Sequence, residues 1–550
     1  MSLGGCSAPS AAPAKADPTI DVTIDVDATA SGTPLEPVWA YYGYDEANTT
    51  TTAEGRELLQ TLAAAHATPV RTRTHFLFNT GDGTPALKWG STNIYTEDAD
   101  GNPVYDYTLI DEIMDATVDA GAFPLVELGF MPEALSTTPD PYRNSDTYAL
   151  DGGCFYPPRD YDKWAALVSE WARHVKERYP EAESTWQWEL WNEPDLPYWK
   201  GTFEEFARLY DYTEAALHSV FPDASLGGPA VAGVSSVFLR DFLEHCATGT
   251  NAVTGETGTR LDMVSFHAKG GVGVTNGYVQ MYLGNQLRLH RTGFQAVKRS
   301  AFAETPIVIS EADPDGCAAC PIAMNPANAY RNSPAYGAYE LSMMKRSLEL
   351  AAAEEVNLRG VLTWAFTFPE TPYFAGYRAL ATNGIHLPVL NAFKLLGGLR
   401  GDRLSVTSSG ARPLDDILAN GVRVEPDIDS LAAIDGDRIQ VLVWNYHDDL
   451  VDAEAATIAI HVSLPPAFGT RAIVTHARVD DAHGNAHTVW VSQGSPATPS
   501  DAELVELQEA MEPAVLERER VVAVTDGVVT LTFELPRFGI SLLTLVPSAD

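Results

Sequence analysis

Residues 161–194 read YDKWAALVSEWARHVKERYPEAESTWQWELWNEP, and this stretch contains one complete helix-then-strand unit. Its first part, residues 161–178, carries apolar side chains at every third or fourth position, which predicts an amphipathic helix. Its last part, residues 186–193, is a short aromatic and apolar run that stops before Pro194, as expected for a buried strand followed by a turn. Helices that alternate with buried strands are typical of a parallel sheet covered by helices.

The same alternation extends over most of the chain. Eight short apolar or aromatic runs are candidate strands: Val38–Gly43, Val70–Phe76, Pro124–Phe130, Trp186–Glu193, Ala224–Ala230, Met263–Lys269, Pro306–Ala312 and Gly360–Thr367. The amphipathic segments between them are candidate helices: Ala53–His66, Tyr107–Ala120, Tyr161–Arg178, Phe203–Val220, Val237–Cys246, Gln280–Phe302, Pro334–Glu354 and Leu390–Leu399. Eight such units predict an α/β fold in which residues 38–400 close into a (β/α)8 TIM barrel. An open doubly wound sheet is the alternative, but the Gly-rich phosphate-binding turn of a dinucleotide fold is absent.

The character of the sequence changes beyond residue 400. Strand-like runs recur there, with one helical segment among them: Leu404–Ser408, Val422–Pro426, Arg438–Tyr446, Thr457–Leu464, Arg471–Arg478, the helix Ser500–Glu512, Val528–Leu535 and Ile540–Val546. Residues 401–550 are therefore predicted to form a C-terminal antiparallel β-sandwich domain. Residues 19–37 begin with the alternating stretch Thr19–Asp27, which predicts a strand that joins this sandwich.

Residues 1–18 are rich in Ala, Ser and Pro and have no periodicity, which predicts a flexible leader. Leu3-Gly4-Gly5-Cys6 has the form of a bacterial lipobox, in which the cysteine carries a lipid, although no basic and apolar signal segment precedes it. We expect an exported protein that is periplasmic, extracellular or an outer-membrane lipoprotein, with membrane attachment only through a lipid on Cys6. A chance cysteine in a linker is the alternative.

Acidic residues outnumber basic ones by 74 to 36, which gives a formal net charge of −38. This charge repels phosphate backbones, and no cluster of Lys or Arg offsets it, so we expect no nucleic-acid partner. A neutral glycan would not be repelled. No stretch approaches the roughly 20 unbroken apolar residues of a membrane-spanning helix, so the chain is not expected to cross a membrane.

Four cysteines remain when Cys6 is set aside: Cys154, Cys246, Cys317 and Cys320. The Cys317-Ala-Ala-Cys320 spacing fits a redox pair, half of a zinc site or a tight disulfide. A four-thiolate zinc site would need a second CxxC, which the sequence lacks, and a thioredoxin-like context is missing too. In an exported protein a disulfide is the favoured interpretation, with two free thiols as the alternative.

Glu193 stands at the end of the fourth candidate strand, within Asn192-Glu193-Pro194. Because TIM-barrel chemistry takes place at the carboxyl ends of the strands, this carboxyl group is expected at the rim of the barrel. Three tryptophans lie close to it in the sequence: Trp188, Trp191 and Trp199. They predict a desolvated carboxyl group with a raised pKa, as a general acid requires, and they offer faces for sugar stacking. An exposed glutamate in a turn is the alternative.

Glu311 ends the seventh candidate strand, in Pro306-Ile-Val-Ile-Ser-Glu311. The ends of the fourth and seventh strands can face each other across a barrel mouth. Glycoside hydrolysis needs two carboxyl groups that flank the bond, and a separation of about 5 to 5.5 Å leads to retention through a covalent intermediate. Glu193 and Glu311 are therefore the candidate catalytic pair. A rim glutamate in a salt bridge is the alternative for Glu311.

Paired glutamates in these two positions, the first as Asn-Glu-Pro, resemble the barrel superfamily of retaining glycosidases. Within it the chain resembles glycoside hydrolase family 39, which contains bacterial β-xylosidases and α-L-iduronidases. The segments that carry this resemblance are Arg73-Thr-His75, Val126-Glu-Leu-Gly-Phe-Met-Pro132, Tyr156-Pro-Pro158 with Asp160-Tyr161, Trp191-Asn-Glu-Pro-Asp195, Ser265-Phe-His267 and Ile309-Ser-Glu311. The resemblance covers most of residues 38–400. It implies that Glu193 is the acid/base and that Glu311 is the nucleophile.

The resemblance also implies six residues that contact the substrate or support the nucleophile: Asn192, Arg73, His75, His267, Trp364 and Glu370. Asn192 would bind the sugar 2-hydroxyl, and Arg73 would favour the ionised form of Glu311. The two histidines would bind hydroxyls or orient the nucleophile. Trp364 would form the sugar platform and Glu370 would reach a distal hydroxyl. Structural histidines, a core tryptophan and a solvated loop acid are the alternatives.

The chain departs from the family pattern after Glu311. β-Xylosidases of this family usually continue Glu-Trp-Asn, whereas this chain reads Glu311-Ala-Asp-Pro-Asp-Gly-Cys-Ala-Ala-Cys320. Because this loop follows the candidate nucleophile, the departure concerns the substrate more than the chemistry.

We therefore expect an exo-acting retaining glycosidase that releases a pentose, foremost xylose, from β-xylosides. It would need neither metal nor cofactor, and it could assemble as a homo-oligomer. Another retaining specificity, such as an arabinosidase or a galactosidase, is the first alternative. A non-catalytic glycan-binding barrel is the second, and a metallohydrolase is the weakest because no ligand spacing such as H-E-x-x-H occurs.

Overall fold

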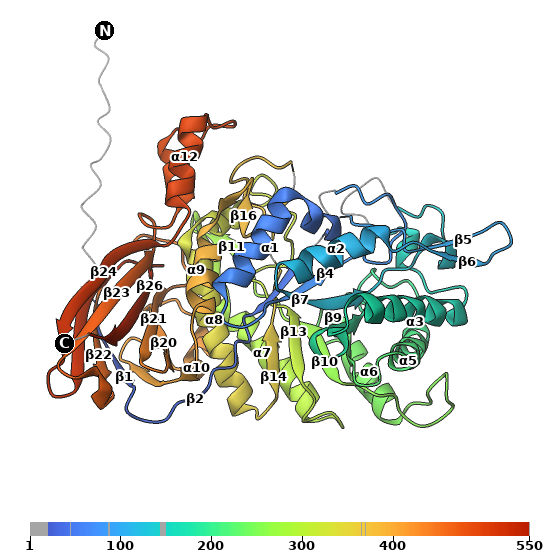
Figure 1. Ribbon diagram of the computed structural model, residues 1–550, viewed down its shortest axis with the longest axis horizontal. Coiled ribbons are helices and arrows are strands. Elements are labelled where there is room, and N and C mark those ends of the chain that lie inside the picture. The colour runs from blue at the N-terminus through green and yellow to red at the C-terminus, as the bar shows by residue number, and fades with distance from the viewer. Residues whose placement is uncertain are drawn as a thin grey trace, which may run out of the picture.

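The computed structural model describes residues 20–44, 46–85, 89–143, 150–364, 366–368 and 370–548. The leader with Cys6 lies outside these residues. The barrel and the β-rich domain lie side by side along the long axis of the molecule (Figure 1). None of the described helices combines the length and apolar character that crossing a membrane requires.

Parallel strands form the barrel: β3 (Tyr41–Tyr44), β4 (Arg71–Thr74), β7 (Phe123–Leu128), β8 (Gln187–Leu190), β9 (Ser225–Val231), β10 (Met263–His267), β13 (Ile307–Glu311), β14 (Leu358–Val361) and β15 (Thr363–Trp364). Neighbours along the chain pair with one another. β14 pairs with β13, and β15 pairs with β3. Since only Leu362 separates β14 from β15, the two are halves of one eighth strand and the sheet closes. The predicted TIM barrel is confirmed.

Helices cover the outside of the barrel: α1 (Ala53–Ala65), α2 (Thr108–Asp119), α3 (Tyr161–Arg178), α5 (Phe203–His218), α6 (Val237–Thr248), α7 (Leu283–Lys298), α8 (Pro334–Ala353) and α9 (Pro388–Gly397). Several start at clear caps. Asp160 accepts hydrogen bonds from two backbone N–H groups of the first turn of α3, and Thr202 forms a reciprocal capping box with Glu205 at the start of α5.

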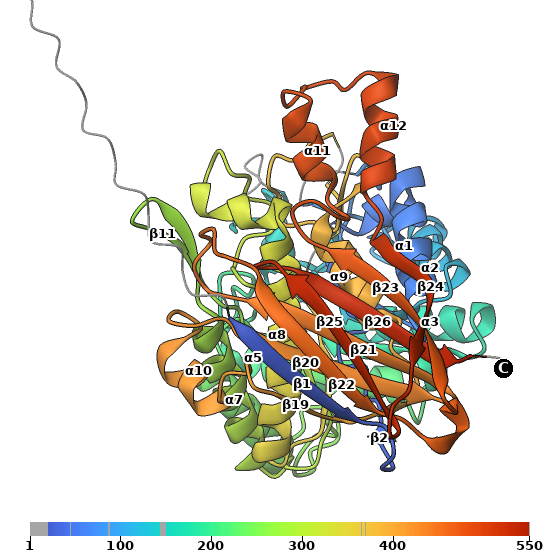
Figure 2. The ribbon, with the colours of Figure 1, turned by 90° about the vertical axis from the view of Figure 1, so that its left-hand side faces the viewer.

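Two sheets form the C-terminal domain, with an apolar core between them (Figure 2). One has the order β19–β1–β22–β25 and the other β2–β18–β20–β21–β26–β23–β24. Their strands are β1 (Asp21–Asp27), β2 (Thr33–Pro34), β18 (Asp402–Arg403), β19 (Ser405–Ser408), β20 (Asp427–Asp435), β21 (Arg438–Tyr446), β22 (Ala456–Ser463), β23 (Arg471–Val479), β24 (Ala514–Ala523), β25 (Val528–Leu535) and β26 (Ile540–Pro547). The sandwich is antiparallel except that the N-terminal strand β1 runs parallel to β22.

The predicted strand Val422–Pro426 is wrong. The strand in this region is β20, which begins after Pro426, and residues 422–426 form a loop in which the Val422 N–H donates to Asp448. β20 was not predicted because acidic residues occupy some of its buried positions, where a strand pattern would show apolar residues. β24 was not predicted because it is an edge strand with mostly exposed residues, and two short helices, α10 (Leu414–Asn420) and α11 (Ala486–Ser492), were also missed.

Helix α8 lies between the barrel and the larger sheet, where it contacts β20, β21 and β26 (Figure 1). Two of its charged residues, Lys345 and Arg346, are buried against the sheet. Lys345 contacts Asp429 at 2.6 Å and Arg346 contacts Asp427 at 2.7 Å. These buried ion pairs connect the two domains, because the cations come from the barrel and the anions from the sandwich.

Candidate active site

A pocket opens at the carboxyl ends of the barrel strands. It is lined by His75, Asn192, Glu193, Tyr198, Lys269, Glu311, Gly316, Cys317, Ala318, Ala319, Trp364 and Arg378. The side chains come from loops or strand ends that follow β4, β8, β10, β13 and β15, so the closure of the barrel brings together residues that are far apart in the sequence.

Glu193 lies three residues beyond the end of β8, in a turn with an unusual backbone. Trp191 has φ of 67° and Glu193 has φ of 45°, in the left-handed region that few residues other than glycine adopt. The Glu193 N–H donates to the Ala230 carbonyl at 2.9 Å, which fixes the turn to the end of β9. A strained backbone that its surroundings hold in place is typical of functional sites, and here it directs the carboxyl group into the pocket.

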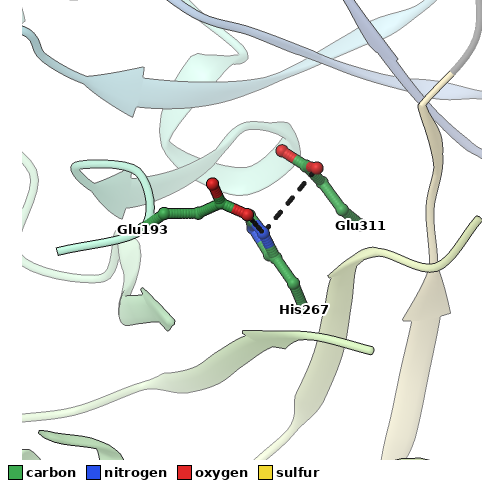
Figure 3. Close-up of side chains that lie close together, drawn as sticks. All are labelled: Glu193, His267 and Glu311. Carbon is green, nitrogen blue, oxygen red and sulfur yellow. Dashed lines mark hydrogen bonds and ion pairs between the residues drawn. The ribbon is translucent and has the colours of Figure 1, made fainter. Parts of the chain in front are cut away.

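Glu311 is the last residue of β13, and it faces Glu193 across the pocket with His267 between them (Figure 3). One oxygen of Glu193, one oxygen of Glu311 and a ring nitrogen of His267 all lie within 4.8 Å of one another. His267 Nδ1 is 2.9 Å from Glu193 Oε1 and 3.7 Å from Glu311 Oε2. The geometry therefore brings the two predicted carboxyl groups into one site.

Lys269 also lies between the two carboxyl groups. Its Nζ is 2.5 Å from Glu311 Oε2 and 3.2 Å from Glu193 Oε1. The three groups Glu193, His267 and Glu311 could otherwise surround a metal ion, but the ammonium group of Lys269 already contacts both carboxylates. Lys269 was not singled out from the sequence, although its place two residues after the end of β10 puts it at the same edge of the barrel.

The ionisation of the two glutamates follows from these contacts. Burial alone would raise both pKa values, but His267 and Lys269 hold the pKa of Glu311 well below its usual range. Against the same burial, Lys269 and His267 lower the pKa of Glu193 to about 2. The sequence-based expectation of a raised pKa at Glu193 is therefore wrong for the empty pocket, because desolvation is outweighed by adjacent positive charge.

Arg73, at the base of the pocket, is fully buried and contacts several site residues. Its Nε is 2.5 Å from Glu189, one terminal nitrogen is 3.3 Å from Glu311, and the other donates to Asn192 Oδ1 at 3.0 Å. Glu127 lies 3.1 Å from the same guanidinium. Burial and the charges of Glu189 and Glu311 raise the pKa of Glu127 well above its usual range, since one guanidinium cannot neutralise three carboxylates.

The raised pKa of Glu127 leads to a matched pair of substitutions, with Glu189 as the second position. Glu127→Gln replaces a carboxyl group whose ionised form is disfavoured by an amide of the same shape, so thermal stability and kcat should change little. Glu189→Gln removes the closest counter-charge of a fully buried guanidinium, which should cost about 3 to 5 kcal/mol of stability. Thermal unfolding of the two variants checks this, and an equal loss in both would contradict the raised pKa of Glu127.

Trp364 ends β15 and forms one wall of the pocket. Its ring packs on His75, with centroids 4.2 Å apart, and over the Arg73 guanidinium at 5.3 Å. Gly43, its pairing partner on β3, permits this position, because a Cβ there would lie 1.9 Å from the Trp364 ring.

Gly43→Ala is therefore expected to displace the Trp364 ring and to lower kcat/KM by about tenfold to a hundredfold. The control is Gly398→Ala, because a methyl group there would make only ordinary contacts, 3.4 Å or longer. Steady-state kinetics of the two variants tests this expectation. Equal activity in both would mean that the position of Trp364 is unimportant.

The tryptophans near Glu193 do not present their faces to the pocket. Trp188 and Trp191 are completely buried, and Trp191 packs edge-on against Phe130 and Trp199. Instead Tyr198 lines the pocket, and its ring stacks on Phe130 at 5.7 Å. The Trp191 indole N–H donates to the Tyr198 carbonyl at 2.8 Å, so the buried ring supports the residue that lines the pocket.

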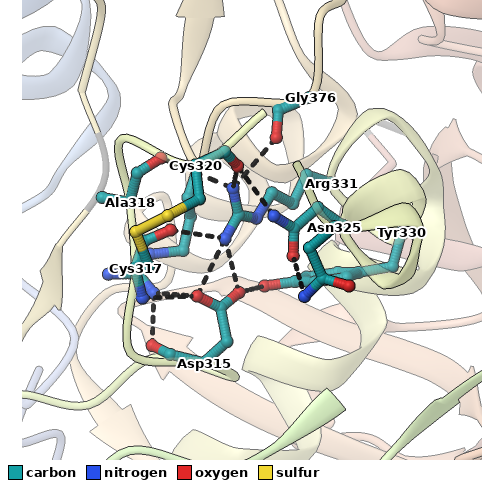
Figure 4. Close-up of a disulfide and its surroundings, with 10 residues drawn as sticks. Asp315, Cys317, Ala318, Cys320, Asn325, Tyr330, Arg331 and Gly376 are labelled. Atoms are coloured by element: carbon teal, nitrogen blue, oxygen red, sulfur yellow. Dashed lines mark hydrogen bonds and ion pairs between the residues drawn. A yellow bond between two sulfur atoms is a disulfide. The ribbon is translucent and has the colours of Figure 1, made fainter. Parts of the chain in front are cut away.

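The loop after Glu311 forms another part of the pocket wall, and Cys317 and Cys320 are joined by a disulfide there (Figure 4). Arg331, which is fully buried, holds this loop together. It donates to the carbonyls of Cys317 and Cys320 at 2.7 Å each and to both carboxylate oxygens of Asp315 at 2.8 Å. The other cysteines within the described residues, Cys154 and Cys246, are buried free thiols.

The structure brings most of the predicted site residues together. Five of them line the pocket, His267 lies between Glu193 and Glu311, Arg73 contacts Glu311, and Glu370 is separate. Glu370 is exposed, and it is not one of the described residues that line the pocket. Lys269, Tyr198 and Arg378 were missed, because strand ends are recognisable in a sequence but the contacts of side chains on loops are not. The loop after Glu311 was expected to bear on the substrate, and its residues Gly316–Ala319 line the pocket.

A TIM barrel with two glutamates that face each other across a pocket at the ends of its fourth and seventh strands defines a glycoside hydrolase. Residues 22–528 match the model of the family described as glycosyl hydrolases family 39. The chain belongs to this family, as its resemblance in sequence implied.

Individual relatives agree with this assignment. A β-xylosidase of Geobacillus stearothermophilus is 27% identical over 88% of this chain and 89% of its own length. An α-L-iduronidase of Canis lupus familiaris is 27% identical over 78% of this chain and 64% of its own length. The crystal structure of the GH39 enzyme from Xanthomonas axonopodis pv. citri superposes with a TM-score of 0.74 at 23% identity, covering 96% of this chain and 97% of that one, and shows the same fold.

Proposed function

We propose that this glycoside hydrolase retains the anomeric configuration and releases xylose from the non-reducing ends of β-xylosides and xylo-oligosaccharides. The observation that carries the retaining mechanism is the short gap between the catalytic carboxyl groups, whose nearest oxygens lie within 4.8 Å. Retaining enzymes have a separation of about 5 to 5.5 Å, whereas inverting enzymes need about 6.5 to 9.5 Å to admit a water molecule. The relative from Geobacillus stearothermophilus, named a β-xylosidase, supports xylose.

The reaction takes two steps at one carbon. In the first, a carboxylate oxygen of Glu311 forms a bond to the anomeric carbon while the bond to the leaving oxygen breaks, and Glu193 gives that oxygen a proton. In the second, Glu193 removes a proton from water, whose oxygen displaces Glu311 from the same carbon. The lowered pKa of Glu311 supports its role, because the attacking form is the carboxylate.

Neighbouring residues would orient the sugar over Glu311. Asn192 lines the pocket, and Arg73 holds its amide oxygen, so its NH2 group is free to turn toward a hydroxyl. His75 contacts Glu311 at 3.4 Å and supports the same oxygen as Arg73. Trp364 and Tyr198 provide the aromatic walls on which apolar sugar faces pack.

A second candidate substrate is a glycoside of a uronic acid. Two cationic side chains, Lys269 and Arg378, line the pocket together with Glu193 and Glu311. A sugar carboxylate could accept hydrogen bonds from these two cations. The relative from Canis lupus familiaris is named an α-L-iduronidase. An arabinoside or galactoside is a further alternative, but no particular contact favours it.

A panel of nitrophenyl or methylumbelliferyl glycosides tests these substrates. The panel contains the β-xyloside, the α-L-iduronide, the α-L-arabinoside and the β-galactoside. Turnover of the β-xyloside with the β-anomer of xylose as the first product, observed by proton NMR before mutarotation, supports the first proposal. Turnover of the iduronide alone would favour the second, and an inverted first product would overturn the retaining mechanism.

We also propose that the protein acts outside the cytoplasm. The Cys317–Cys320 disulfide supports this, because such bonds persist in oxidising compartments. Fractionation of cells that express the chain with its own leader tests the location, and mass spectrometry of the mature N-terminus tests whether Cys6 carries a lipid.

A further inference from the structure

The contacts of Glu193 are at odds with its proposed first task. In the glycosylation step it must carry a proton, but its Oε1 accepts a hydrogen bond from the Lys269 ammonium group and also lies against a ring nitrogen of His267. Lys269 Nζ lies 3.2 Å from Glu193 Oε1, and His267 Nδ1 lies 2.9 Å from the same oxygen. The adjacent ammonium charge disfavours a proton on Glu193, so protonation is favoured only when the contact with Lys269 weakens.

Lys269 is the partner that can leave. His267 belongs to β10 and is fully buried, so its ring has no room to move away. The Lys269 side chain is 18% exposed, lines the pocket and is borne on the loop after β10, directly before Gly270 and Gly271. A lysine ammonium is a flexible point charge with three donors, so it can exchange a carboxylate for another oxygen at little cost.

The other charged groups around this pair belong to the framework. Glu311, on β13, and Glu127, on β7, act on Glu193 as like charges. Arg378 and Asp313 act on Lys269, and Arg378 is itself held by Asp313 at 3.1 Å and by Asp315 at 2.9 Å. These partners are buried, so binding of a sugar is not expected to move them.

We propose that Lys269 is a mobile counter-ion, which bridges Glu193 and Glu311 in the free enzyme and turns to an oxygen of the sugar when substrate binds. This inference rests on the proposed function. Once the ammonium group has left, Glu193 takes up one proton from the buffered solution and becomes the acid that the first step needs. Lys269 stays protonated and forms no covalent bond, so the net change on binding is the uptake of one proton.

The proposal predicts a difference between two pH profiles. The profile of kcat/KM reports the free enzyme, and the profile of kcat reports the enzyme–substrate complex. In the free enzyme the pKa of Glu193 is low, so kcat/KM should begin to fall at a lower pH than kcat does, by about one pH unit or more. Both profiles fall on the alkaline side, because loss of the proton from Glu193 removes the acid.

Lys269→Met removes the charge and keeps the length of the side chain. In this variant Glu193 is protonated more easily before substrate binds, so the alkaline limb of kcat/KM should move up to that of kcat. Lys269→Arg keeps the charge and should keep the two limbs apart. A purely structural role for Lys269 would lower both parameters without moving either limb, and that result would overturn the proposal.

Proton uptake can be measured without turnover. Titration calorimetry with the non-hydrolysable 1-thioglycoside of the best panel substrate, in buffers of different ionisation enthalpy at pH 5, should give an uptake close to one proton for the wild type. Lys269→Met should take up less, and Glu193→Gln none. If the wild type hydrolyses a glycoside but takes up no proton on binding, the proposed role of Lys269 is overturned and the proposed function stands. Absence of hydrolysis of every glycoside in the panel would instead overturn the proposed function.

Discussion

Glu311→Ala should lower kcat by on the order of 10⁴-fold or more, because the variant has no atom that can form the covalent intermediate. The gap left by the side chain lies beside Lys269 and Arg73, whose nitrogens contacted the missing oxygens at 2.5 and 3.3 Å. A small anion is therefore attracted to it. Added azide should restore turnover of an activated glycoside and should yield a glycosyl azide of the opposite anomeric configuration.

The measurement is the rate of nitrophenol release with and without azide, followed by NMR of the product. Glu304→Ala is the control, because the Glu304 side chain is 89% exposed and only 3.8 Å from Lys298 on the surface. Rescue with a product of unchanged configuration would show that Glu311 is not the group that attacks the anomeric carbon. Full activity of Glu311→Ala without azide would contradict its role altogether.

Glu193→Gln should lower kcat/KM by about 10²- to 10⁴-fold for substrates with a poor leaving group. An activated leaving group such as dinitrophenolate departs without a proton, so the first step should then be nearly normal and the covalent intermediate should accumulate. Azide, which needs no general base, should speed its breakdown and give a glycosyl azide of the same configuration as the substrate.

The dependence of rate on leaving-group acidity, measured with a series of substituted phenyl glycosides, is the test. The wild type should show a shallow dependence and Glu193→Gln a steep one. Equal slopes would mean that another group supplies the proton. The opposite anomeric outcomes with azide at Glu193 and Glu311 distinguish the two roles.

The barrel was predictable because its signal is local and repeated. Each strand is a short apolar run followed by an amphipathic helix such as α3, and eight repeats leave few other folds. β20 shows where prediction from local sequence patterns fails. Its Asp427 and Asp429 face Lys345 and Arg346 of α8, so residues that are buried in the folded protein look exposed in the sequence.

The residues of the candidate site also fall into those that the sequence reveals and those that it does not. Glu193 and Glu311 could be found because each ends a recognisable strand, and closure of the barrel then brings them together. Lys269 could be placed at the same edge but not given a contact, since a flexible side chain on a loop has no periodic signal. The pKa of Glu193 was misjudged for this reason. The aromatic neighbours are visible in the sequence, whereas the cation that outweighs them lies on the loop that follows β10.

The position of α8 limits how this protein can be divided or recombined. A fragment that ended near residue 400 would contain every residue that lines the pocket, but Lys345 and Arg346 would lose Asp429 and Asp427. The sandwich is thus an integral part of the scaffold on which the pocket is built. Exchange of catalytic barrels between relatives should therefore carry the sandwich along, and gene fusions should be joined outside both parts.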